Sequence, residues 1–171
     1  MAENSRERMV RYLQDAHAAE VGVKEALESF IDDQDDPMVR SLFQEHIALT
    51  ESQADRLEQR LRAYDETPCG GKGFLNSLMA KMQEMMHGAH DEYDKRTQNL
   101  IKAYATEHLE MGMYEAMSGY ADAIGDNETS MLARQIMQEE KQTAEKIWPL
   151  ISQTAMAAVD KTSDGGRAYP L

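Results

Sequence analysis

Ionisable residues interrupt the apolar stripes of the long helices that the sequence predicts. Glu20 lies seven residues from both Leu13 and Leu27, where a helix facing a core would place an apolar residue. The same pattern occurs elsewhere in the chain, and the residues concerned are Glu20, His46, Glu107, Glu110 and Glu140. A buried carboxylate is costly unless it is paired or binds a metal. Several such residues at one level of a helical bundle therefore indicate a metal site.

The heights of these residues can be compared from their distances to the predicted turns. With a first turn near residue 35, Glu20 and His46 differ by about four residues, or roughly 6 Å along the helices. With a second turn near residue 126, Glu110 and Glu140 are nearly level, and Glu107 lies on the face of Glu110. Carboxylates with an imidazole suit iron or manganese, and a carboxylate can bridge two ions.

Each residue has a simpler interpretation when it is taken alone. Glu20 could pair with Lys24 on the surface, and His46 could be a core histidine whose nitrogens are satisfied. Glu139 and Glu140 are adjacent, so only one of them can face the core and the other is expected in solvent. The metal interpretation is favoured because all four long helices contribute at compatible heights.

Four long helices and one short helix are predicted from apolar periodicity and from capping residues. Ser5 is the expected cap of the first helix, Asp36 and Pro37 start the second, and Gly125 ends the third. The expected ranges are 5–33, 37–65, 74–87 (the short helix), 90–124 and 128–159. Pro149 is expected to kink the last helix or to distort its last turns. The pattern predicts an all-α fold, a ferritin-like four-helix bundle with one long crossover over residues 1–160, and a flexible C-terminal tail over 161–171.

Composition excludes several functional classes. The 171 residues carry a formal net charge of -13, which disfavours binding to nucleic acid or to anionic membranes. A single cysteine, Cys69, allows no internal disulfide and no cysteine-based metal cluster. The charged N-terminus is followed by no long apolar run, so a cytoplasmic protein is expected. The methionines of segment 79–86 are more typical of an apolar helix face than of a copper site.

The same residues resemble those of a ferritin-like family, the YciE/YciF-type bacterial stress proteins. The matching pieces are Asp15-Ala16-His17-Ala18-Ala19-Glu20, Phe43-Gln44-Glu45-His46 with Thr50, Gln53 and Arg56, Glu107-His108-Leu109-Glu110 with Tyr114, and Glu139-Glu140-Lys141. The Glu-x-x-Glu spacing also resembles that of rubrerythrins. The resemblance implies a di-iron-type site with Glu20, His46, Glu107, Glu110 and Glu140 as ligands.

The chain departs from these patterns at three positions. Leu49 stands where the family often has an acid three residues after the histidine. Ferritins and rubrerythrins use Glu-x-x-His on the second and fourth helices, whereas here Phe43 precedes His46 and Thr143 follows Glu140. The site is therefore poorer in ligands than that of a ferroxidase.

Two functions follow as expectations. The first is a stress-related protein that binds iron or manganese and oxidises ferrous iron or reduces peroxide. The second is a non-enzymatic stress or structural protein that dimerises through its helices and has an empty or degenerate site. In either case a homodimer or larger homo-oligomer is the expected assembly.

Overall fold

A computed structural model describes residues 4–69, 77, 80–82, 84–86 and 88–159. Four long helices make up most of this part of the chain: α1 (Ser5–Asp32), α2 (Pro37–Arg62), α4 (Glu92–Ile124) and α5 (Asn127–Ala157). No described residue lies in a β-strand. None of the described helices is long and apolar enough to cross a membrane.

The first hairpin is defined by side chains that cap its helices. Asn4, rather than the expected Ser5, caps α1: its side chain accepts a hydrogen bond from the backbone of Glu7, and the Glu7 side chain accepts one from the backbone of Asn4. This reciprocal arrangement satisfies two backbone donors that the first helical turn leaves unpaired. Asp36 caps α2 and Pro37 takes its first position, as the sequence predicts.

The second hairpin also follows its sequence signals. Asp91 caps α4, which ends at Gly125 with a left-handed φ of 78°. Asp126 then accepts a hydrogen bond from the backbone N–H of Thr129 and caps α5. Pro149 lies inside α5 without ending it, because the helix continues to Ala157.

Helix α2 is shorter than the sequence suggested. It ends at Arg62 rather than near Asp65, because Asp65 adopts a left-handed φ of 55° and the N–H of Glu66 turns back to the carbonyl of Leu61. A left-handed residue closed by such a hydrogen bond is a common way to end a helix.

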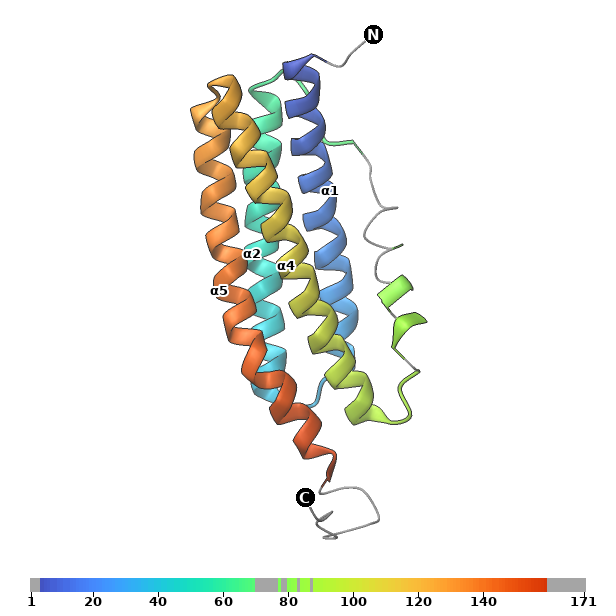
Figure 1. Ribbon diagram of the computed structural model, residues 1–171. Helices are drawn as coiled ribbons and strands as arrows, with labels where there is room; N and C mark the ends of the chain where they lie inside the picture. The colour runs from blue at the N-terminus through green and yellow to red at the C-terminus, as the bar shows by residue number, and fades with distance from the viewer. Residues whose placement is uncertain (1–3, 70–76, 78–79, 83, 87, 160–171) are drawn as a thin grey trace.

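The helices form a four-sided bundle in which α1 contacts α2 and α4, and α5 contacts α4 and α2. α2 ends at the end of the bundle where α1 begins, whereas α4 begins at the opposite end (Figure 1). The connection between the hairpins therefore spans the length of the bundle, as a ferritin-like crossover does. Much of the predicted short helix 74–87 and all of the predicted tail 161–171 lie outside the described residues, although 77, 80–82, 84 and 85 are helical.

Two apolar clusters fill the core on either side of a polar layer. One includes Leu13, Leu57 and Ile136, and the other includes Leu27, Phe43 and Leu100. The buried acids and His46 are the residues that the sequence placed between such apolar positions on the stripes. The two clusters stabilise the bundle and so hold the polar layer away from water.

Candidate metal centre

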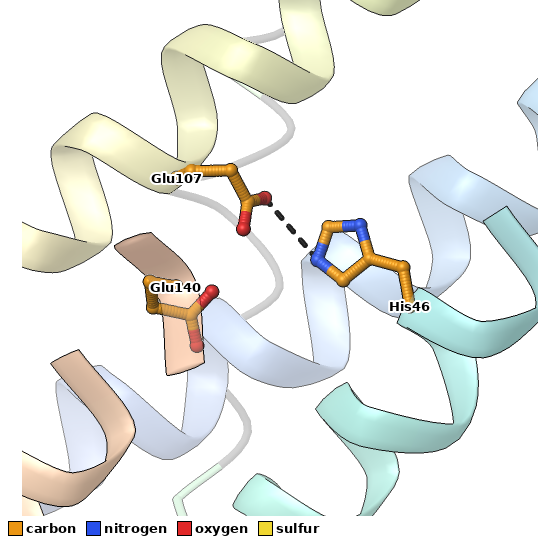
Figure 2. A group of neighbouring side chains, drawn as sticks. All are labelled: His46, Glu107 and Glu140. Atoms are coloured by element: carbon orange, nitrogen blue, oxygen red, sulfur yellow. Dashed lines mark ion pairs between the residues drawn. The ribbon is translucent and has the colours of Figure 1, made fainter. Parts of the chain in front are cut away.

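His46 on α2, Glu107 on α4 and Glu140 on α5 come together in the core. One ligand atom from each lies within 4.8 Å of the others, and the three side chains point toward one another (Figure 2). His46 Nε2 lies 3.2 Å from Glu107 Oε1. The three residues are at most 2% exposed. Three helices thus deliver one imidazole and two carboxylates to a single point.

Glu20 and Glu110 are equally buried but do not belong to this close group of three. Both are 1% exposed, and their carboxyl groups interact electrostatically with Glu140. Glu20 accepts a hydrogen bond from the hydroxyl of Tyr114. All five residues that the sequence singled out therefore lie in the core, and three of them converge. The surface pair between Glu20 and Lys24 is absent, since Lys24 contacts Glu51 at 2.8 Å and Glu28 at 3.6 Å.

A polar network supports the centre from the side of α2. The Gln53 amide donates hydrogen bonds to Glu140 Oε1 and to Glu139 Oε2. Arg56 binds both oxygens of Glu139, with one contact of 3.1 Å. Glu139 is thus partly buried in an ion pair rather than solvated as expected. This chain of contacts fixes the orientation of Glu140.

Burial controls the protonation of the centre. It lowers the pKa of His46 from 6.5 to about 4, so the imidazole is neutral at pH 7 and keeps a lone pair for a ligand bond. Burial is also the main cause that raises the pKa of Glu107 to about 8 and that of Glu140 to about 9. Burial, followed by the charges of neighbouring glutamates, raises the pKa values of Glu20 and Glu110 in the same direction.

Several oxygen and nitrogen atoms of the centre make no hydrogen bond with the described residues. Both carboxyl oxygens of Glu110, Oε2 of Glu20 and Nδ1 of His46 have no hydrogen-bond partner there, and Glu107 contacts only the neighbouring ligands His46 and Glu140. Buried polar atoms are ordinarily hydrogen-bonded. An ion with oxygen and nitrogen ligands would satisfy these atoms together, so the residues fit a metal such as iron or manganese.

Leu49 and Thr143 supply no further carboxylate or imidazole. Both line a small crevice beside His46, and the Thr143 hydroxyl donates to the backbone oxygen of Glu139 at 3.2 Å. The ring of Tyr104 packs at a tilt against those of Trp148 and His108 at the side of the bundle. The sequence analysis did not predict two contacts, Tyr114 to Glu20 and Gln53 to Glu140. Their residue spacing nevertheless indicates that both side chains face the core. Tyr114 follows Glu107 by seven residues, and Gln53 follows His46 by seven.

The family model described as a domain of unknown function, DUF892, matches residues 4–160. The chain belongs to the DUF892 family. Membership spans all four helices and the whole centre. Because no activity is attached to DUF892 by that description, the chemistry has to be argued from the residues themselves.

Solved structures place this DUF892 chain among ferritin-like proteins. A protein from Xanthomonas campestris is 25% identical, with a TM-score of 0.78 over 92% of this chain and 98% of that one. The E. coli stress protein YciF is 18% identical, with a TM-score of 0.78 over 90% and 98%. Dps from Thermosynechococcus elongatus is 16% identical, with a TM-score of 0.70 over 86% and 92%. The predicted ferritin-like fold and the resemblance to YciE/YciF-type proteins are confirmed.

Proposed function

We propose that this protein binds iron or manganese in the core of its bundle and uses the metal for redox chemistry, either oxidising ferrous iron or reducing peroxide. The proposed ligands are Glu20, His46, Glu107, Glu110 and Glu140. The observation that carries the proposal is the convergence of His46, Glu107 and Glu140 to within 4.8 Å in a buried layer with unsatisfied donor atoms. Oxygen-rich donor sets with an imidazole are typical of iron and manganese sites.

The chain's own residues prepare the centre for a cation. The neutral His46 offers its lone pair without first losing a proton. The glutamates hold protons in the metal-free protein and release them when a cation takes their place, so binding and deprotonation are coupled. Tyr114 and Gln53 hold Glu20 and Glu140 in position. A bound iron or manganese ion would supply the electron transfer, and the protein would supply the ligands and exclude water.

Metal analysis of protein purified without chelator tests this proposal. The wild type is expected to contain iron or manganese, and the double variant Glu20→Ala plus Glu107→Ala is expected to lose it. A matched control, Glu28→Ala plus Glu115→Ala, removes two exposed acids from the same two helices and should keep the metal. If the variant with both core substitutions still contains the metal, the proposed site is wrong. Oxygen or peroxide consumption in the presence of ferrous iron then distinguishes a redox enzyme from a binding protein.

The second candidate is a non-enzymatic protein that dimerises through its helices. It is favoured by an exposed aromatic surface, in which Trp148 is 62% exposed and packs against Tyr104 with ring centroids 5.0 Å apart. Exposed aromatic side chains are enriched at protein interfaces. Sedimentation of metal-free wild type and of Trp148→Glu tests this function. A dimer that forms without metal and is lost in the variant would support it.

A further inference from the structure

The proposed centre is closed to water, so an ion must pass between packed side chains to reach it. The structure shows a small crevice of about 30 Å³ beside His46, between α2 and α5. Leu42, Glu45 and Leu49 form its α2 wall, and Thr143 and Lys146 form its α5 wall. That volume is close to the share of one water molecule in the liquid. The crevice is therefore large enough for about one water molecule or one small ion, and His46 itself forms part of its wall.

A surface groove lies next to this crevice. The groove has a volume of about 570 Å³ and extends toward Met38 and Gln153. Like the crevice, it follows the line along which α2 and α5 pack together, which we call the α2–α5 seam. It shares Leu42, Glu45 and Lys146 with the crevice. Groove and crevice thus lie side by side, with these three side chains between solvent and the wall formed by His46.

An exposed ion pair stands where the groove meets the crevice. Lys146 Nζ lies 3.7 Å from Glu45 Oε2, and the two side chains are 61% and 65% exposed. Exposed pairs of this kind contribute little to stability, so the two side chains separate readily. When they separate, Glu45 is left as a carboxylate that attracts a cation to the mouth of the crevice.

Farther along α2 and α5, the seam is closed by a network of hydrogen bonds that includes a positively charged guanidinium. Arg56 and Glu139 form a two-pronged ion pair across it, and Gln53 joins this pair to Glu140. Opening the seam there would break several hydrogen bonds, and the guanidinium would repel an incoming cation. Beside Leu49 the seam is crossed instead by the exposed pair of Glu45 and Lys146, which separates more readily than the Arg56 network.

We propose that divalent metal ions enter and leave the buried centre through the seam between α2 and α5, passing Glu45 and Lys146 and then Leu49 and Thr143. The proposal rests on the proposed function and adds to it the route by which the site is filled. Leu49 controls the width of this route because it lines the crevice without offering a ligand atom. Lys146 controls the electrostatic repulsion that a cation meets on this route.

Stopped-flow binding of Co²⁺, a spectroscopic stand-in for Fe²⁺, tests the route. Leu49→Phe should slow association and dissociation together by about tenfold, and Leu49→Ala should speed both, because a change in a path alters both rates. The equilibrium dissociation constant should stay the same in both variants. Unchanged rates in both variants, or a change in dissociation alone, would overturn the route.

A charge reversal provides an independent test with a matched control. Lys146→Glu should raise the association rate constant for Co²⁺ roughly threefold at low salt, because it puts a second carboxylate at the mouth. Lys24→Glu makes the same change of charge on the other side of α2, where Lys24 bridges α1 and α2 through Glu51, and should have a smaller effect. Equal acceleration in both variants would show attraction by the whole protein and overturn the route.

The two proposals can fail separately. If the wild type binds Co²⁺ stoichiometrically and the core variants do not, the proposed metal site stands. If the Leu49 and Lys146 variants then behave as wild type, only the proposed route is overturned. Wild-type protein that binds no metal at all overturns both proposals, since the seam then has nothing to admit.

Discussion

The hydroxyl of Tyr114 on α4 donates a hydrogen bond to the carboxyl group of Glu20 on α1, and both residues are almost completely buried. The contact joins the two hairpins at the level of the proposed centre. It also favours the charged form of Glu20 and so opposes the rise in its pKa that burial causes.

Tyr114→Phe should therefore weaken the centre without dismantling it. Loss of the hydroxyl leaves a buried carboxyl oxygen without its donor, which should cost about 1 kcal/mol of unfolding free energy. Metal affinity should fall by about tenfold, the effect expected when a ligand loses its supporting hydrogen bond. Urea denaturation and calorimetric titration measure the two effects. Tyr104→Phe, on the same helix but packed against Trp148, should change neither.

The metal-free protein should lose stability as the pH rises. The pKa values of Glu107 and Glu140 are raised from 4.5 to about 8 and about 9. Between these values and 4.5 the folded protein holds protons that the unfolded chain has released, so a higher pH favours unfolding. Urea denaturation with chelator should show the free energy of unfolding falling from about pH 5 to about pH 9. Saturating metal should remove this fall, and a flat profile without metal would contradict the assignment.

Glu107→Gln should separate stability from binding. The amide has nearly the shape of the acid but needs no proton, so the metal-free variant should be more stable than wild type by about 1–3 kcal/mol at pH 7. Its affinity for iron or manganese should nevertheless fall by more than about a hundredfold, because a carboxylate ligand is lost. A variant that loses both stability and binding would indicate a structural role for the carboxyl group.

Leu49→Glu should add the ligand that the chain lacks. Residue 49 is one helical turn after His46 and lines the crevice beside it, so a carboxylate there can reach the centre. Binding should tighten by about tenfold or take up a further ion, as measured by titration and metal analysis. Leu49→Gln has the same length without the charge and is the control. Equal affinities in the two variants would place residue 49 outside the reach of the ion.

Much of this architecture follows from local rules. Asp36 with Pro37, and Gly125 with Asp126, mark helix ends because capping and left-handed backbone depend on neighbouring residues alone. The acids within the apolar stripes were visible as breaks in a helical period. The errors at Ser5 and near Asp65 concern helix ends, where Asn4 and Asp65 compete with their neighbours for the same backbone donors and acceptors. The error at Glu139 has another cause, because its partner Arg56 comes from a different helix.

The sequence by itself determined that four helices carry acids and one histidine on their buried faces. Only the tertiary structure decided which of these atoms meet. His46, Glu107 and Glu140 converge, Glu20 turns to Tyr114, and Arg56 with Gln53 restrains Glu139 and Glu140. The reason is that helix rotation and relative height are set by the packing of apolar side chains far apart in the chain. That packing also left a small crevice beside His46 and Leu49, which no periodicity could have shown.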